Sequence, residues 1–320
     1  MKKVTISLVL ILSASQCFSE LNNNIRDSLN YKLNVGMAFR MPIFDFSIHD
    51  TKEKSQKIYY SANVPLTLSA SFYYKSLGIS ISKELTSTVD EAEKYGKTKY
   101  TDIQLHYFSK KFGYELYYQK YSGYYLDNFD VFGYLEGDEN SIRPDIKNQN
   151  VGLNVFYVFS DRYSAKTLFN QSERQKKWNW SVIMMGSLNQ LRINSNKNLI
   201  PSNEASYYDD DYNYRGGIYN FFTAGVGVAG ILPFHNFYVS ETILVGFGLS
   251  QSENQYLTNR KQGLDVFGKI NFKIGMGYNG KRLYTGMNTS MDSTSPMESS
   301  SSVRFYTFSG YVEFFLGLKF

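Results

Sequence analysis

The sequence is poor in the residues that build metal centres and disulfide frameworks. Its 320 residues include one cysteine, three histidines and six prolines. A single cysteine excludes a disulfide framework and a cysteine-based metal cluster, and three scattered histidines leave little for a zinc enzyme. We therefore expect no metal and no cofactor. The formal net charge of +5 is small and dispersed along the chain, which argues against nucleic acid as a partner.

Long hydrophobic runs are also missing after the first residues of the chain. Beyond the N-terminus, no stretch approaches the roughly 18 apolar residues that mark a transmembrane helix. Basic residues at positions 2–3, an apolar run over 4–12 and small residues after it have the order of a secretory signal. We predict a signal peptide over 1–19 and one mature domain over 20–320. The alternative is a lipoprotein signal with Cys17 as the acylated residue.

Aromatic residues, by contrast, are abundant, and they accompany an alternating pattern. The 28 tyrosines and 24 phenylalanines argue against disorder. Apolar and polar residues alternate over 264–278, and period two predicts a β-strand. A strand of this length with one wholly apolar face suits a membrane barrel, in which outward residues contact lipid and inward residues face a polar lumen.

Twelve such segments recur along the chain, an even number as in bacterial single-chain barrels. They cover residues 33–43, 64–74, 77–85, 98–109, 112–121, 149–159, 178–192, 217–231, 236–250, 262–278, 281–291 and 304–320. Short and long polar links alternate between them. The predicted fold class is therefore all-β: a single antiparallel transmembrane β-barrel of about 12 strands, with short periplasmic turns and long extracellular loops.

Two hairpins predict the register, and one connection breaks the pattern. A turn at Asn279-Gly280, a strong hairpin signal, would set Met276 opposite Leu283. A turn at residues 110–111 would set His106 opposite Glu115, facing inward.

The connection over 160–177 is a long link on the short-turn side. We interpret it as a plug in the lumen or a periplasmic segment, whose polar residues include Asn170, Gln171, Glu173, Arg174 and Gln175.

The last segment alternates apolar residues up to the C-terminal residue. Its outward face includes Phe314, Leu316, Leu318 and Phe320. A terminal phenylalanine after alternating apolar residues resembles the assembly signal of outer-membrane barrels. We therefore expect outer-membrane lipid and the barrel-assembly machinery as partners.

Tyrosine pairs such as Tyr59-Tyr60 and Tyr73-Tyr74 lie near strand ends. They predict an aromatic girdle together with loop packing.

Inward polar residues are the only candidates for chemistry. His106 beside Glu115, with Asp102 nearby, could form a general base, but no serine on these strands is placed as a nucleophile. The alternative is an ion-pair network that fills a narrow lumen. Its expected members are Asp102, His106, Glu115, Gln119, Lys269, Lys273 and Glu313, and we also expect Arg40 and Arg282 to face inward. This mixture of signs argues against a strongly ion-selective pore.

The acidic run over 209–211 allows two interpretations. Three carboxylates could offer oxygen ligands to a divalent cation, but the run lacks the spacing of a calcium loop. Solvated loop surface is the simpler interpretation.

Four phrases together resemble a known family. They are YGKTKY at 95–100, DIQLHY at 102–107, YYQKYSGYYL at 117–126 and FNQSERQKK at 169–177. They are similar to the bacterial domain-of-unknown-function family 4421, known mainly from Bacteroidetes, over most of the mature chain. WNWS at 178–181 replaces the Ser-Ala-Gly-Ser-like stretch that the family often shows. The family has no established activity, so the resemblance implies an outer-membrane barrel and no particular reaction.

The sequence thus predicts a protein exported by a signal peptide to the outer membrane of a Gram-negative-type bacterium. The expected role is not enzymatic: a narrow small-solute channel, or a structural or surface protein. The alternatives are a membrane-embedded enzyme acting on lipid or glycan through His106 and Glu115, and a soluble secreted β-protein.

Overall fold

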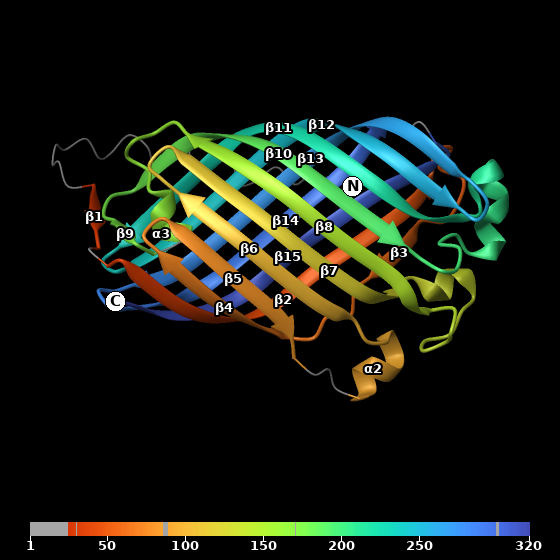
Figure 1. Cartoon of the computed structure of the whole chain (residues 1–320), viewed down its shortest axis with the longest axis horizontal. Coiled ribbons are helices and arrows are strands. Elements are labelled where there is room, and N and C mark those ends of the chain that lie inside the picture. The colour runs from red at the N-terminus through yellow and green to blue at the C-terminus, as the bar shows by residue number, and fades with distance from the viewer. Residues whose placement is uncertain (1–24, 30, 86–88, 170, 299–300) are drawn as a thin grey trace, which may run out of the picture.

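Strands make up most of the chain (Figure 1). The computed structural model describes residues 25–29, 31–85, 89–169, 171–298 and 301–320. The predicted signal peptide, Cys17 and Asn170 lie outside the described residues. The long strands are β2 (Leu33–Asp50), β4 (Thr67–Tyr74), β5 (Leu77–Glu84), β6 (Lys99–Phe108), β7 (Phe112–Leu126), β8 (Ile142–Val158), β10 (Asn179–Asn194), β11 (Tyr214–Phe234), β12 (Phe237–Tyr256), β13 (Arg260–Asn279), β14 (Leu283–Glu298) and β15 (Val303–Lys319).

These twelve strands form one closed antiparallel ring. Each pairs with the next, and β15 pairs with β2 to close the barrel. The predicted twelve-stranded barrel is confirmed. The wall formed by β4, β5 and β6 is shorter than the rest, and β3 (Ile58–Ser61) bridges β2 and β7 at the long-loop end. None of the helices in the described ranges is both long and apolar enough to cross a membrane.

The two ends of the barrel differ, as predicted (Figure 1). At the long-loop end lie α2 (Val89–Tyr95) and the 3₁₀ helices η2 (Phe129–Phe132), η3 (Ser202–Tyr207) and η4 (Asp209–Asp211). At the short-turn end lie α3 (Ala165–Phe169) and a small two-stranded sheet of β1 (Arg26–Ser28) and β9 (Glu173–Gln175). The C-terminus is at this same end. The exceptional connection over 160–177 therefore belongs to the short-turn end.

The outer face of the barrel is apolar across its middle. Val226, Phe247 and Ile270 are 54%, 61% and 56% exposed, because nothing in the protein covers them. Such a band is stable only against lipid acyl chains. Lys83 lies on this face opposite Leu68, and its long side chain can extend toward the polar interface.

One predicted register is confirmed and the other is wrong. His106 pairs with Glu115, as expected. Met276, however, pairs with Met287 rather than Leu283. The chain turns at residues 281–282, and the Gly280 N–H donates to the Leu283 carbonyl oxygen at 3.0 Å. The shift is four residues, an even number, so every side chain keeps its face.

Asn279 explains why the turn lies later than predicted. Its side-chain amide donates to the Glu173 carbonyl oxygen at 2.8 Å, and its amide oxygen accepts a hydrogen bond from Lys319. These contacts keep Asn279 in the ladder and place the turn on the next two residues. Arg282, predicted to face the lumen, is consequently exposed in the turn.

Two apolar clusters occupy the lumen, one toward each end. The larger lies toward the long-loop end and includes Phe46, Tyr60, Tyr124 and Tyr208, each at most 2% exposed. The smaller lies toward the short-turn end and includes Tyr163 and Tyr238. Adjacent tyrosines are divided by the alternation: Tyr59 is exposed on the outside, and Tyr60 is buried inside. The predicted girdle therefore accounts for only one tyrosine of such a pair, and the other packs inside the barrel. The polar inward residues lie between the clusters.

Candidate functional site

The middle of the lumen contains a polar chamber. Its volume is about 240 Å³, and inward side chains from strands all around the barrel line it. Most of the lining residues are serine, threonine, asparagine, glutamine, tyrosine and charged residues. A cavity of roughly 150 Å³ holds one benzene molecule, so the chamber has room for one small solute.

Arg40 on β2 connects three strands of the barrel wall. Its guanidinium lies 2.7 Å from a Glu313 oxygen on β15 and 2.9 Å from an Asp102 oxygen on β6. The guanidinium carbon lies 4.3 Å from the centre of the Tyr311 ring. Asp102 also accepts a hydrogen bond from the Tyr100 hydroxyl at 3.0 Å. Arg40 and Asp102 are both nearly inaccessible to solvent, so this cluster is a fixed part of the wall.

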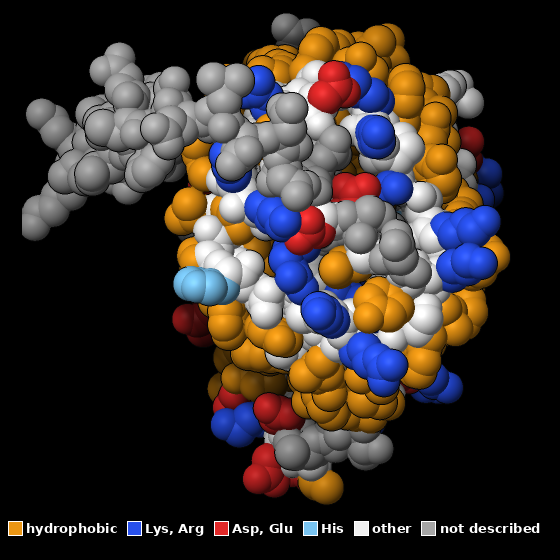
Figure 2. Space-filling view, turned by 90° about the vertical axis from the view of Figure 1, so that its left-hand side faces the viewer, with side chains coloured by type: hydrophobic (Ala, Val, Ile, Leu, Met, Phe, Trp, Pro, Cys, Tyr) orange, Lys and Arg blue, Asp and Glu red, His pale blue; other side chains and the backbone are white. Residues whose placement is uncertain are grey.

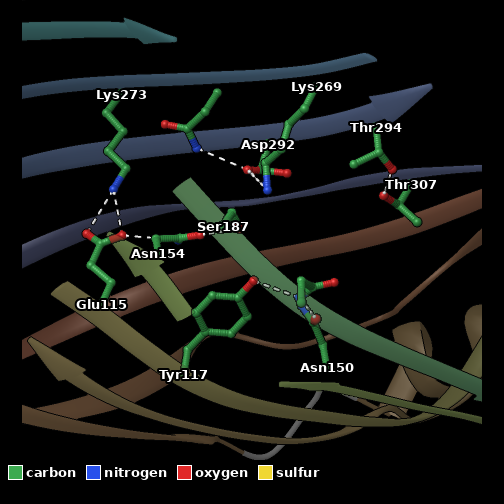
Figure 3. A network of polar contacts seen from close by, with 12 residues as sticks. Glu115, Tyr117, Asn150, Asn154, Ser187, Lys269, Lys273, Asp292, Thr294 and Thr307 are labelled. Carbon is green, nitrogen blue, oxygen red and sulfur yellow. Dashed lines mark hydrogen bonds and ion pairs between the residues drawn. The ribbon is translucent and has the colours of Figure 1, made fainter. Parts of the chain in front are cut away.

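Lys273 and Glu115 form an ion pair across the lumen (Figure 3). The Lys273 Nζ on β13 lies 3.0 and 3.3 Å from the two Glu115 carboxylate oxygens on β7. Four strands separate β7 from β13 on one side of the ring, and six separate them on the other. The pair therefore connects nearly opposite walls. Asn154 donates to the same carboxylate at 3.4 Å, and Ser187 donates to Asn154 at 2.7 Å.

A second group of polar contacts continues the network toward the long-loop end (Figure 3). Lys269 lies 3.1 Å from a carboxylate oxygen of Asp292, which also accepts a hydrogen bond from Asn271. Asn189 donates to the Tyr117 hydroxyl at 2.8 Å and to the Asn150 amide oxygen at 2.6 Å. Each Lys, Arg, Asp and Glu that lines the chamber in the described part of the chain is thus in an ion pair, and the remaining wall is made of neutral polar and apolar groups.

The predicted network residues all lie on the lumen side. Six of them line the chamber: His106, Glu115, Gln119, Lys269, Lys273 and Glu313. Asp102 is buried behind them against Arg40. Asp292, Tyr117 and Asn150 also line the chamber, although they were not among the predicted network members. Each follows the same inward alternation on its strand.

The hypothesis of a His106–Glu115 general base receives no support from the geometry. The two residues are neighbours across β6 and β7, but the Glu115 carboxylate bonds Lys273 and Asn154 instead. The His106 Nδ1 is buried without a hydrogen-bond partner among the residues that the structure describes. A general base needs its imidazole oriented by a partner group, and this arrangement leaves His106 without one.

A second histidine contact, on β2, was not predicted from the sequence. Ser47 Oγ lies 3.0 Å from His49 Nε2 on the outer face of β2. Ser47 is 7% exposed, and the His49 ring packs on Tyr306 with centroids 4.3 Å apart. Within the described ranges no carboxylate hydrogen-bonds this histidine. The pair lacks the third member and the access of a catalytic triad, so we assign it a structural role.

The connection over residues 195–213, here called the cap, packs against the long-loop end of the lumen. The Tyr60 hydroxyl donates to the Leu199 carbonyl oxygen at 2.8 Å. The Arg143 guanidinium donates to the Asn198 carbonyl oxygen at 3.1 Å, and an Asp145 carboxylate oxygen accepts the Lys197 N–H at 3.0 Å. These contacts tie the cap to inward residues of the barrel wall.

Asp211 fastens the cap on its other side. Its carboxylate lies 2.7 Å from the Lys261 Nζ and accepts hydrogen bonds from the Ser302 hydroxyl and N–H. Burial raises the pKa of this carboxyl, but the hydrogen bonds from Lys261 and Ser302 outweigh burial and lower the pKa below its ordinary value. The interpretation of 209–211 as solvated surface is therefore wrong for Asp211. It holds for Asp209, which pairs with Lys52 in the open.

The connection over residues 160–177, here called the short-turn segment, lies against the opposite mouth. Gln171 lines the chamber and donates to the Tyr238 hydroxyl at 3.0 Å. Arg174 donates to the Asn279 carbonyl oxygen at 2.9 Å, and Glu173 accepts from Ser164 at 2.7 Å. Gln175 is buried and donates to carbonyl oxygens of the segment itself. The segment is thus tied to the barrel, and part of it enters the lumen.

A closed ring of twelve antiparallel strands with an apolar outer face and a polar lumen defines a transmembrane β-barrel protein. The family model described as "Domain of unknown function (DUF4421)" matches residues 26–320. The chain therefore belongs to this family, as the sequence resemblance predicted.

Solved structures with similar overall arrangement are outer-membrane proteins. The outer membrane protease OmpT from Escherichia coli is 7% identical, with a TM-score of 0.43, covering 90% of this chain and 96% of that chain. An outer membrane channel from Pseudomonas putida F1 is 11% identical, with a TM-score of 0.36 and coverages of 94% and 100%. The P. putida toluene transporter TodX is 8% identical, with a TM-score of 0.31 and coverages of 90% and 90%. A comparison with curated protein sequences finds no match.

Proposed function

We propose that the protein is a narrow channel for small uncharged polar solutes, closed in the conformation described above. The observation that carries this proposal is the polar chamber of about 240 Å³ in the lumen, lying between the cap and the short-turn segment. A protein with a purely structural role has no need of such a space, because side chains could fill it. Each charged group that lines the chamber in the described ranges is held in an ion pair, so none of them is free to attract an ion strongly.

We further propose the outer membrane of a Gram-negative-type bacterium as its location. Export by the predicted signal peptide would place the short-turn end on the periplasmic side. The last strand supports assembly from that side, because Phe314, Leu316, Leu318 and Phe320 are about half exposed or more on its outer face. The barrel-assembly machinery and outer-membrane lipid are the partners that this proposal requires.

Transport is favoured over catalysis by the state of the two histidine sites. In the described part of the chain no carboxylate orients His106, which faces the chamber, and Ser47, the partner of His49, is buried. We therefore propose that the protein is not an enzyme. A hydrolytic activity that His106→Ala or Ser47→Ala abolishes would contradict this part of the proposal.

Planar-bilayer conductance tests the channel proposal. We would compare refolded residues 20–320 with a variant lacking residues 164–175, which removes Gln171 and its contact with Tyr238. The expected result is little or no current for the intact protein and steady current with weak ion selectivity for the deletion. A variant lacking α2, residues 89–95 at the other end, is the matched control and should behave as the intact protein. Silence of the 164–175 deletion would contradict the proposal.

A further inference from the structure

The hairpin turns at the short-turn end carry cationic residues where turn geometry favours others. Lys75 has a φ of 54°, in the left-handed region that glycine and asparagine adopt most readily. A second turn is made around Lys110 and Lys111. A third uses Lys281 and Arg282, although Asn279-Gly280 directly precedes it. Three of the four hairpin turns thus hold lysine or arginine against their local preference. Such departures are expected where a residue serves a function other than folding.

Few acidic residues balance these charges. Figure 2 looks onto this end and shows basic side chains gathered there, with hydrophobic side chains around the rim. Asp161 pairs with Lys111 at 2.9 Å, and Asp27 pairs with Lys176 at 2.7 Å. Lys110, Lys281 and Arg282 are exposed and form no ion pair with any described residue. Among the described residues, this end of the barrel therefore has a net positive charge that its few carboxylates do not neutralise.

The cations stand next to lipid-facing aromatic residues. Tyr74 precedes Lys75 and is 51% exposed on the outer wall, with the Lys75 Nζ 5.4 Å from its ring centre. Phe112, which follows the second turn, is 45% exposed, and Trp178 at the end of the short-turn segment is 43% exposed. Aromatic residues in this position lie at the level of the lipid headgroups. The turn cations, one residue further out, are thus at the level of the phosphates.

We infer that this basic collar, made of Lys75, Lys110, Lys111, Lys281 and Arg282, binds the headgroups of anionic phospholipids in the adjoining leaflet. Charge complementarity and the depth of the collar both favour lipid phosphate. The anionic cell wall and an acidic protein would instead be reached by groups that project away from the membrane. The inference depends on the barrel lying in a membrane, and it holds whether or not the lumen conducts.

The protein carries its own probe for this binding. Its two tryptophans are Trp178 and Trp180, both exposed to lipid at this end of the barrel. Bromine on a lipid acyl chain quenches tryptophan fluorescence on contact. Quenching by brominated phosphatidylglycerol relative to brominated phosphatidylcholine, in mixed vesicles, therefore measures the preference of the collar for the anionic lipid.

The test variant is the triple change Lys75→Asn, Lys110→Asn and Lys281→Asn, in which asparagine suits the turns at least as well as lysine. The control is Lys54→Asn, Lys97→Asn and Lys197→Asn, which removes three exposed lysines from the opposite end. One lysine near an anionic surface is worth about fivefold in affinity. We expect the intact protein and the control to prefer phosphatidylglycerol at least about fivefold, and the test variant, which keeps Lys111 and Arg282, to show a clearly smaller ratio.

Three results would overturn the inference. The first is equal quenching by the two lipids in the intact protein. The second is a preference that survives unchanged in the test variant, since the collar would then not be its source. Sedimentation of the refolded protein with peptidoglycan in place of any lipid preference would identify the cell wall as the partner and would also overturn it. Added salt should weaken a true headgroup preference.

Discussion

Breaking the ion pair between Lys273 and Glu115 should destabilise the barrel, because the pair connects nearly opposite walls. Glu115→Gln keeps the shape of the side chain and removes its charge. Lys273 then loses the partner that lies 3.0 Å away. Lys273→Met removes the other charge and leaves Glu115 with the 3.4 Å hydrogen bond from Asn154.

The size of the effect follows from how much solvent reaches the pair. The Lys273 and Glu115 side chains are 21% and 10% exposed. Exposed pairs contribute about 0–1 kcal/mol, and removing one partner of a fully buried pair costs about 3–5 kcal/mol. For this mostly buried pair in a polar lumen we expect each single change to lower the free energy of unfolding by about 2 kcal/mol. The double variant should lose less than the sum, with a coupling energy of about 1–2 kcal/mol.

Equilibrium unfolding in urea, with the barrel refolded in lipid vesicles, measures these four free energies. Trp178 and Trp180 lie on the outer face of β10 or just before it, so their fluorescence reports insertion. The matched control is Lys83→Met, which removes a lysine from the outer face and has no part in the lumen network. Additivity of Glu115→Gln and Lys273→Met within about 0.3 kcal/mol would refute the reasoning, since the two charges would then not act on each other.

Three further predictions concern the cap, the wall and the last residue. The lowered pKa of Asp211 means that its contribution to holding the cap is present at neutral pH and is lost as the pH falls through that pKa, below the ordinary carboxyl value of about 4; hydrogen exchange over 208–213 should accelerate there, and Asp211→Asn should show a smaller step. A Cβ at Gly152 would lie 2.3 Å from the Tyr117 ring, so Gly152→Val should lower the free energy of unfolding by about 2 kcal/mol, whereas Gly186→Ala, which meets no atom within 4 Å, should not. Phe320→Ala should reduce the heat-modifiable barrel formed in cells but leave refolding in detergent unchanged.

Alternation of apolar residues was sufficient to predict the barrel, its strand number and the face of each strand that points outward. Each strand must present an apolar face to lipid, so the pattern persists over many residues. The same alternation placed Glu115 and Lys273 on the lumen side. It could not indicate that they bond each other, because their strands are far apart in sequence and their distance across the lumen depends on how the barrel closes.

Turn chemistry and the ends of the lumen were less predictable. Asn279-Gly280 has the residues of a tight turn, yet contacts of Asn279 with Glu173 and Lys319 keep it in the strand. Those partners come from other connections, which local sequence does not reveal. The burial of Asp211 could not be predicted for the same reason, because Lys261 and Ser302 reach it only when the loops fold together.

The most direct test of the account asks whether solute passes through the chamber. The only cysteine of the sequence is in the predicted signal peptide, so a single new thiol can be placed in the mature chain. Ser290 lines the chamber and is 9% exposed, whereas its neighbour Met291 is 38% exposed on the outer face. In the variant lacking residues 164–175, a bulky thiol reagent should block the bilayer current of Ser290→Cys and leave that of Met291→Cys unchanged. A current that persists after complete labelling of Ser290→Cys would show that the chamber is not the path.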